Sequence, residues 1–191
     1  MKVGLFGGSF DPVHHGHLIV AQVLAEALAL DELRFVPARE QPFKVGRHGA
    51  PPESRARMLA LAIQQEPRFR LERAELDRPG PSYTIDTLRL LTGREPDHRF
   101  TLLVGADAAR ELPSWREAPQ LAGLAELALF ARSGEAVPPL PWPHRTVTVP
   151  GMDISATAIR RRAAEGRSVR YWVPDAVAEV IRLERLYLSD A

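Results

Sequence analysis

Two histidines stand where a glycine-rich turn opens into a predicted helix. The segment 7–18 reads GGSFDPVHHGHL and follows a short apolar run, and His14 and His17 lie three residues apart near its end. Residues at that spacing share one face of a helix, so the two imidazoles should lie close together beside the free backbone N–H groups of the first turn. Those N–H groups and the helix dipole favour an anion. The pattern therefore predicts phosphate binding at the start of this helix.

The same turn carries small residues that suit contact between backbone and phosphate. Gly7, Gly8 and Ser9 would allow the close approach. A Walker A loop needs a lysine followed by serine or threonine after its glycines, and that pair is missing here. A dinucleotide fingerprint needs G-x-G-x-x-G with an acidic residue about 20 positions on, and that spacing is missing too. The turn is thus of a phosphate-binding type that matches neither of these common motifs.

The HHGH run at 14–17 also permits a zinc interpretation, since imidazole is a common zinc ligand. The sequence has no cysteine, and no nearby carboxylate pattern completes a metal site. A third interpretation is that these histidines are simply solvated on a loop. We favour phosphate binding at the helix start over both alternatives, and we expect no metal to be held directly by protein side chains.

A second group of polar residues lies in the segment 153–162, which reads DISATAIRRR. Ser155 is a suitable N-cap, and Thr157 lies in the first helical turn. Arg160 follows Thr157 by three residues on the same face, with a side chain that leans toward the helix N-terminus. The segment could therefore form a second anion site. Taken alone, it fits better with an ordinary capped helix that carries a solvated arginine face.

Apolar runs and amphipathic segments alternate along the chain, and they predict the elements that hold these sites. Strands are predicted at 2–6, 33–36, 100–104, 127–131 and 145–149, with an extended segment at 69–76. Helices are predicted at 17–30, 53–65, 155–164 and 174–186, and another runs from an N-cap at Ser82 through Leu91 to a C-cap at Gly93. Segments 39–52 and 138–143 are predicted loops. This order is typical of a Rossmann-like α/β fold with a doubly wound, mostly parallel sheet flanked by helices.

Composition fits one globular domain spanning residues 1–191. Hydrophobic residues make up 45% of the chain and charged residues 26%, close to globular averages. The net charge of +1 disfavours nucleic acid as the main partner, because such proteins are usually strongly basic. The absence of cysteine excludes disulfides, thiolate zinc sites and cysteine nucleophiles. No segment has signal-peptide character or the roughly 20 apolar residues of a membrane helix, so we expect a cytoplasmic protein without membrane contact.

Together the two polar segments resemble the nucleotidyltransferase superfamily, in which an HxGH motif and an ISSTxIR motif converge on the triphosphate of ATP. The motifs read HHGH at 14–17 and ISATAIR at 154–160, with Ala156 where serine is frequent. Three further segments look like those of the bacterial nicotinate-nucleotide adenylyltransferase family. They are GPSYTIDT (80–87), GADAARELPSW (105–115) and YWVPDAVAEVIRLERLY (171–187). Pantetheine-phosphate adenylyltransferases and cytidylyltransferases share the HxGH motif but resemble these segments less.

The resemblance implies which residues bind the two substrates. His14, His17 and Arg160 would be catalytic, and Mg²⁺ would be bound mainly through ATP phosphates. The implied ATP contacts are Gly7, Gly8, Ser9, Phe10, His14, His17, Gly105, Asp107, Ser155, Thr157 and Arg160. Asp107 also follows a predicted strand at its carboxyl end, where open sheets bind ligands, and it suits a ribose hydroxyl.

Nicotinate mononucleotide would contact Ser9, Lys44, Thr84 and Trp115. Thr84 and its backbone would receive the nicotinate carboxylate, while Trp115 would stack on the pyridine ring. Trp115 could instead be a core residue, and Lys44 a solvated loop lysine, because QPFK departs from the PPHK-like sequence common in the family. We favour substrate contact for both.

The implied reaction is adenylyl transfer from ATP to nicotinate mononucleotide, giving nicotinate adenine dinucleotide and pyrophosphate in NAD biosynthesis. Direct attack by the acceptor phosphate on the α-phosphorus needs no protein nucleophile. One alternative is the same fold acting on nicotinamide mononucleotide or phosphopantetheine, and another is a non-catalytic nucleotide-binding regulatory module. A nucleic-acid role for the arginines at 160–162 is the weakest alternative. The sequence leaves the oligomeric state open.

Overall fold

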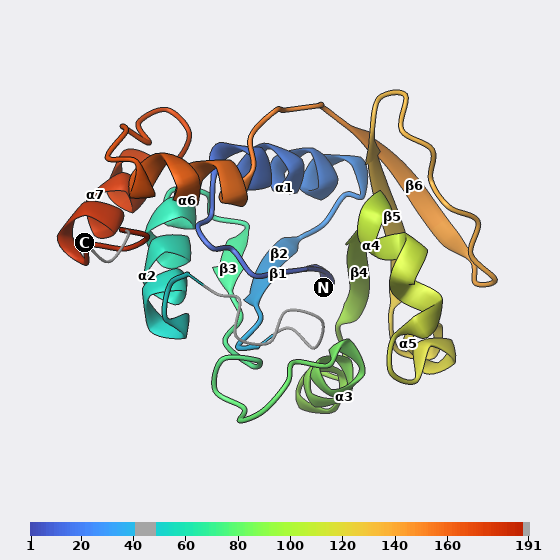
Figure 1. Ribbon diagram of the computed structural model, residues 1–191. Helices are drawn as coiled ribbons and strands as arrows, with labels where there is room; N and C mark the ends of the chain where they lie inside the picture. The colour runs from blue at the N-terminus through green and yellow to red at the C-terminus, as the bar shows by residue number, and fades with distance from the viewer. Residues whose placement is uncertain (41–48, 189–191) are drawn as a thin grey trace.

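A single parallel sheet forms the centre of the computed structural model, which describes residues 1–40 and 49–188. In this part of the chain the sheet has six strands in the order β3-β2-β1-β4-β5-β6, and all neighbours pair in parallel (Figure 1). The strands are β1 (Lys2–Gly8), β2 (Glu32–Pro37), β3 (Phe69–Leu71), β4 (Arg99–Gly105), β5 (Glu126–Arg132) and β6 (His144–Val149). The Rossmann-like fold predicted from the sequence is therefore confirmed.

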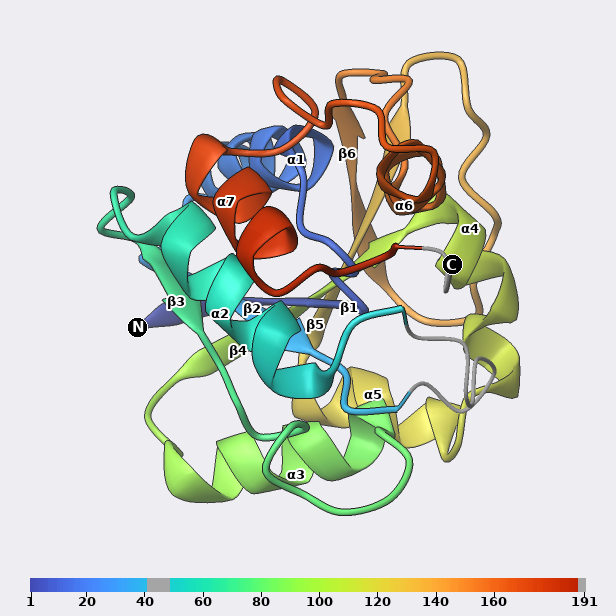
Figure 2. The same ribbon diagram turned by 60° about the vertical axis from the view of Figure 1, so that its left-hand side comes forward.

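Helices cover both faces of the sheet, and each face has its own apolar cluster. The helices are α1 (His15–Ala27), α2 (Pro52–Ile63), α3 (Thr84–Arg94), α4 (Ala106–Glu111), α5 (Ala118–Leu124), α6 (Ala156–Ala164) and α7 (Asp175–Leu183), with a 3₁₀ turn η1 (Leu112–Ser114). Helices α1, α2, α6 and α7 pack into one cluster and α3, α4 and α5 into the other (Figures 1 and 2). Phe6 faces the first cluster and Leu5 the second, because successive strand side chains alternate between faces.

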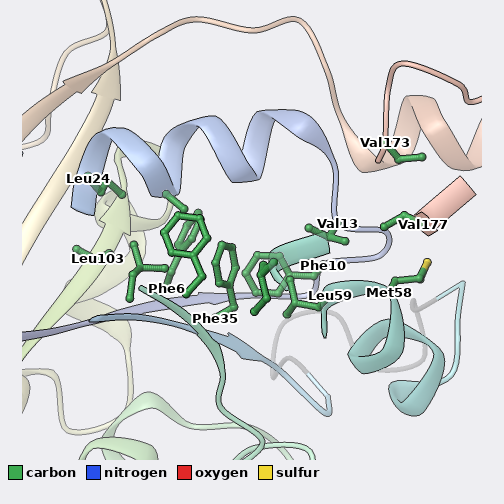
Figure 3. Packing of buried hydrophobic residues seen from close by; sticks show 14 of the residues in the cluster. Phe6, Phe10, Val13, Leu24, Phe35, Met58, Leu59, Leu103, Val173 and Val177 are labelled. Atoms are coloured by element: carbon green, nitrogen blue, oxygen red, sulfur yellow. The ribbon is translucent and has the colours of Figure 1, made fainter. Parts of the chain in front are cut away.

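Aromatic rings fill the first cluster directly beneath α1. Phe6, Phe10 and Phe35 contact one another with ring centroids 5.6 to 5.7 Å apart (Figure 3). Phe10 belongs to the turn that follows β1 and has a positive φ of 47°. Its ring therefore anchors the glycine-rich turn to the core.

The strand order creates a switch point between β1 and β4. From β1 the chain passes through α1 to β2 and then to β3, and it returns through α3 to β4 on the other side of β1. In such sheets ligands bind in the crevice outside the carboxyl ends of the strands where the winding reverses. Gly8 and Gly105 end the two strands at this place.

Some helix boundaries predicted from the sequence are wrong. Tyr83, not Ser82, is the N-cap of α3, and the Ser82 hydroxyl instead accepts a hydrogen bond from the backbone N–H of Arg39 at 3.0 Å. Gly93 is not a C-cap, because α3 continues to Arg94. The Arg94 guanidinium pairs with Glu72 at 2.6 Å, and this tertiary contact supports the last turn.

Other differences concern short elements. The strand predicted at 69–76 ends at Leu71, and α7 begins at Asp175 and ends at Leu183 rather than spanning 174–186. Helices α4 and α5 were not predicted, since six and seven residues are too few for a clear helical period. The proline-rich segment 138–143 forms no strand, as predicted.

No helix in residues 1–40 and 49–188 is long and apolar enough to cross a bilayer. Most of the predicted loop at 39–52 lies outside the described residues, and α2 begins at its last residue. The cytoplasmic location stays a prediction.

Candidate active site

The two histidines of the opening turn lie close together, as their spacing predicts, and their rings stack. His14 is the N-cap of α1, and its ring centroid lies 3.7 Å from that of His17, with the planes inclined by 23°. The backbone N–H of His14 donates to Nδ1 of His17 at 3.3 Å. Neutral His17 therefore carries its proton on Nε2, and this N–H makes no hydrogen bond within residues 1–40 and 49–188, so it can serve as a donor there.

Burial keeps both imidazoles neutral at pH 7. Desolvation and the nearby His15 lower the pKa of His14 to about 4. Desolvation and the neighbouring His14 also lower the pKa of His17 well below its ordinary value. Nδ1 of His14 is buried without a hydrogen-bond partner among the described residues.

Gly16 leaves the space that the His14 ring occupies. A Cβ at this position would lie 3.0 Å from Nδ1 and 3.1 Å from Cε1 of that ring. A side chain here would therefore displace the imidazole, which explains why the motif has glycine between its histidines. Phe10 supports the pair from below, with its ring centroid 5.1 Å from that of His17.

The second anion site predicted from the sequence meets the first in space. The Ser155 hydroxyl caps α6 by accepting from the Ala158 backbone N–H at 3.2 Å, as predicted. Nη2 of Arg160 donates to the Thr157 hydroxyl at 3.3 Å, and Nη1 donates to the backbone carbonyl of Asp11 at 2.8 Å. Segments 149 residues apart thus join at one edge of the sheet.

A cavity of about 300 Å³ opens at the carboxyl ends of the strands. Gly7, Gly8, Gly105, Thr84 and Trp115 all line it, so five of the predicted substrate contacts lie around one space. Its other walls are mainly apolar and come from β1, β2, β4, α3 and Phe130 of β5. Both the predicted phosphate turn and the predicted acceptor residues therefore reach this crevice.

The other predicted contacts do not line the cavity, and these include His14, His17, Ser155, Thr157 and Arg160. Phe10 is buried in the core, and Ser9 follows the last lining residue of β1. Asp107 lies in the first turn of α4, where it is exposed and paired with Arg110. Lys44 falls outside the described residues.

Comparison with known proteins identifies the family of this chain. Residues 5–162 match the cytidylyltransferase-like family model. A probable nicotinate-nucleotide adenylyltransferase from Thermus thermophilus is 48% identical over 187 residues, which cover 98% of this chain and 100% of that relative. One from Roseiflexus sp. RS-1 is 43% identical over 194 residues, covering 97% of both chains.

This chain belongs to the nicotinate-nucleotide adenylyltransferase family. It is therefore a nucleotidyltransferase, as the two motifs predicted. A solved Plasmodium falciparum nicotinic acid mononucleotide adenylyltransferase, complexed with NaAD, shares the fold with a TM-score of 0.78 at 18% identity, covering 97% of each chain.

Sequence reasoning missed a buried arginine that holds the site of this family member together. Arg55 is fully buried, with Nη1 donating to the Ser9 carbonyl at 2.6 Å and Nη2 to the Arg39 carbonyl at 3.1 Å. Desolvation lowers its pKa, but the nearby Asp11 carboxylate favours its charged form. A signal was present, because Arg55 shares the apolar face of α2 with Met58 and Leu59.

A buried carboxylate in the cavity wall was also missed. Glu75 lines the cavity and accepts a hydrogen bond from the Thr87 hydroxyl at 2.9 Å. Burial raises the pKa of Glu75. Its place in a polar segment after β3 gave no sign of burial, since that depends on how α3 packs against the segment.

In the described part of the chain no group of three or more histidine, cysteine, aspartate or glutamate side chains could hold a metal ion.

Proposed function

We propose that this protein transfers the adenylyl group of ATP to nicotinate mononucleotide, forming nicotinate adenine dinucleotide and pyrophosphate in NAD biosynthesis. The main observation in support is that Arg160 reaches Asp11 of the histidine-bearing turn. Gly7 and Gly8, which lead into this turn, line one cavity together with Thr84 and Trp115. Phosphate-binding groups and an aromatic acceptor pocket thus occupy the same edge of the sheet. The names of the relatives from Thermus and Roseiflexus support the same activity.

The chemistry would be one in-line displacement. An oxygen of the acceptor phosphate forms a bond to the α-phosphorus as the bond to the bridging oxygen breaks, and pyrophosphate leaves. The attacking phosphate is already anionic, so the protein needs to supply position and charge stabilisation rather than a nucleophile or a strong base. Neutral imidazoles that donate N–H groups and an arginine that is always charged meet that need.

We assign ATP to the turn and to the start of α6. Nε2–H of His17, with His14 beside it, would stabilise charge at the α-phosphate, while Ser155, Thr157 and Arg160 would hold the departing pyrophosphate. The turn residues Gly7, Gly8, Ser9 and Phe10 would approach the nucleotide through their backbone, and Gly105 and Asp107 would lie on its ribose side. Mg²⁺ would bind mainly to ATP oxygens and retain water, as it commonly does in such sites.

The acceptor fits the wall formed by α3 and η1. No side chain caps α3 at Tyr83, so the first N–H groups of that helix remain available for a carboxylate at Thr84. The Trp115 ring offers a flat apolar surface for a pyridine ring. Lys44 would add a contact to the mononucleotide phosphate, and Ser9 would lie between the two substrates.

Pyrophosphate release tests the proposal directly. The protein is incubated with Mg-ATP and with nicotinate mononucleotide, nicotinamide mononucleotide or phosphopantetheine, and we expect the highest kcat/KM for the first acceptor. A preference for nicotinamide mononucleotide would contradict the roles given to Thr84 and Trp115. ATP binding without pyrophosphate release for any acceptor would instead support a non-catalytic nucleotide-binding module.

The His17→Ala variant tests the phosphate site in the same assay. We expect kcat to fall by roughly 100-fold or more, because a donor to the transition state is lost, while circular dichroism shows an intact fold. His144→Ala is the matched control, since His144 lies at the start of the edge strand β6. Near-normal turnover of the His17→Ala variant would refute the assignment.

A further inference from the structure

The buried carboxylate of Asp11 joins two distant segments of the chain to the histidine-bearing turn. Asp11 is only 3% exposed. Its Oδ2 accepts from the Gly49 backbone N–H at 2.8 Å, and its Oδ1 accepts from the Ala50 N–H at 3.1 Å and from the Tyr187 hydroxyl at 2.8 Å. Tyr187 is 176 residues away in sequence, beyond the last helix. Both carboxylate oxygens are thus engaged by donors from outside the turn.

Arg160 contacts the same aspartate on another side. Its Nη1 donates to the Asp11 carbonyl at 2.8 Å and lies 3.9 Å from Oδ2 of Asp11, while Nη2 donates to Thr157 at 3.3 Å. The guanidinium is therefore held between the start of α6 and the turn. Any shift of Asp11 would move the backbone carbonyl that accepts the hydrogen bond of Arg160.

Tyr187 packs against Gly49, and Arg160 lies next to the same glycine. A Cβ at Gly49 would lie 2.8 Å from Cδ1 of Tyr187 and 3.0 Å from Cδ of Arg160, so the three residues meet without spare room. Burial and the adjacent Asp11 carboxylate raise the pKa of Tyr187, and its hydroxyl is a protonated donor at neutral pH. Tyr187, Asp11 and Arg160 thus form one packed and hydrogen-bonded unit.

We infer that Tyr187 is a positioning residue for the phosphate site: by hydrogen bonding to Asp11, it holds Arg160 where the pyrophosphate portion of ATP binds. This inference rests on the proposed function for the role of Arg160. An arginine that is already ordered loses less side-chain freedom when it binds a phosphate. The segment after α7 would therefore raise affinity for ATP without touching it.

Calorimetric titration with Mg-ATP in the absence of acceptor tests the inference. Tyr187→Phe removes one hydroxyl and keeps the ring, and we expect the Kd for ATP to rise about five- to tenfold, the effect of losing one hydrogen bond. Tyr171→Phe is the matched control, because Tyr171 is 80% exposed and its hydroxyl has no partner within the described ranges. We expect its Kd to stay within about twofold of the native value.

A double-mutant cycle separates positioning of Arg160 from general damage. In the Arg160→Ala background, Tyr187→Phe should change the Kd for ATP no further, because the group it positions is gone. An equal loss in both backgrounds, or an unchanged Kd in Tyr187→Phe alone, would overturn the inference.

Two controls keep the outcome decisive. Thermal unfolding checks that each variant is folded, and every Kd is measured at least about 10 °C below the lowest unfolding midpoint, so that only folded protein is compared. ATP binding is measured without acceptor, so a failure of transfer to nicotinate mononucleotide would contradict the proposed acceptor and leave this result standing. Absence of ATP binding by the native chain would contradict the proposed function itself.

Discussion

Neutral histidines and buried ions define the site at the scale of single residues. His14 and His17 stack with depressed pKa values, so each can offer an N–H donor to a phosphate without carrying a charge itself. The buried charges bind the backbone instead. Arg55 donates to the Ser9 carbonyl, and the Asp11 carboxylate accepts from the N–H groups of Gly49 and Ala50. The histidines offered to substrate are thus neutral, while the buried charges fix the backbone of the turn.

The low pKa of His14 predicts acid sensitivity. The unfolded chain takes up a proton on this residue near pH 6.5, whereas the folded chain does so only near pH 4. Protonation of His14 therefore does not affect the free energy of unfolding above pH 6.5, and it lowers that free energy progressively as the pH falls from 6.5 to 4. Between pH 7 and 4.5 we expect the native chain to lose about 2 kcal/mol more than His14→Gln. Urea titrations at the two pH values measure this, and equal losses in both proteins would contradict it.

Helix starts are the functional units at the scale of elements. His14 occupies the N-cap position of α1 and the Ser155 side chain caps α6. The two helix starts lie close together, since a Cβ on Gly16 would be 4.0 Å from Cβ of Ile154. The starts of the two helices therefore lie near one another, and a helix start favours an anion. The Arg160 contact with Asp11 then fixes α6 relative to the turn.

Variants of Ser155 separate capping from ligand binding. Ser155→Ala should lower the free energy of unfolding by about 1 kcal/mol, because the cap to the Ala158 N–H is lost. Ser155→Asp should keep the stability, since aspartate caps as well as serine, but should weaken ATP binding at least about tenfold through repulsion of the phosphates.

Denaturation and ATP titration of both variants give the two readouts. Tight ATP binding by Ser155→Asp would place the phosphates elsewhere than at the start of α6.

The whole molecule is a sheet between two apolar layers. Trp172 packs against the cluster that contains α1 and α7, and Trp142 against the cluster that contains α3 and α5. Every strand from β3 to β6 pairs with its neighbour, so both apolar layers pack against the same continuous sheet. We therefore propose that residues 1–191 form one cooperative domain.

Two single-tryptophan proteins test cooperativity. One keeps only Trp172 and the other only Trp142, with phenylalanine at the remaining tryptophan positions. Because both layers share the sheet, we expect each protein's fluorescence transition in urea to coincide with the loss of its own circular dichroism signal. Transitions that separate within one protein would show that the two faces unfold independently.

The sequence by itself determined the local features of this protein. Strand and helix periods are properties of neighbouring residues, so the six strands, the proximity of His14 and His17, and the cap at Ser155 could all be predicted. The two motifs also indicated the family, because each is a short run of residues with fixed spacing. The end of α3 was missed because a tertiary ion pair of Arg94 supports its last turn, and its start was missed because the Ser82 hydroxyl binds the Arg39 N–H instead of capping the helix.

Tertiary structure alone decided what fixes these features in place. Asp11, Arg55, Glu75 and Tyr187 act through partners 12 to 176 residues away, and no local pattern encodes such contacts. The order of strands is likewise set by crossovers, and it is this order that places Gly8 and Gly105 side by side at the cavity. Burial, charge pairing and the convergence of two helix starts are consequences of packing, and packing is a property of the folded chain as a whole.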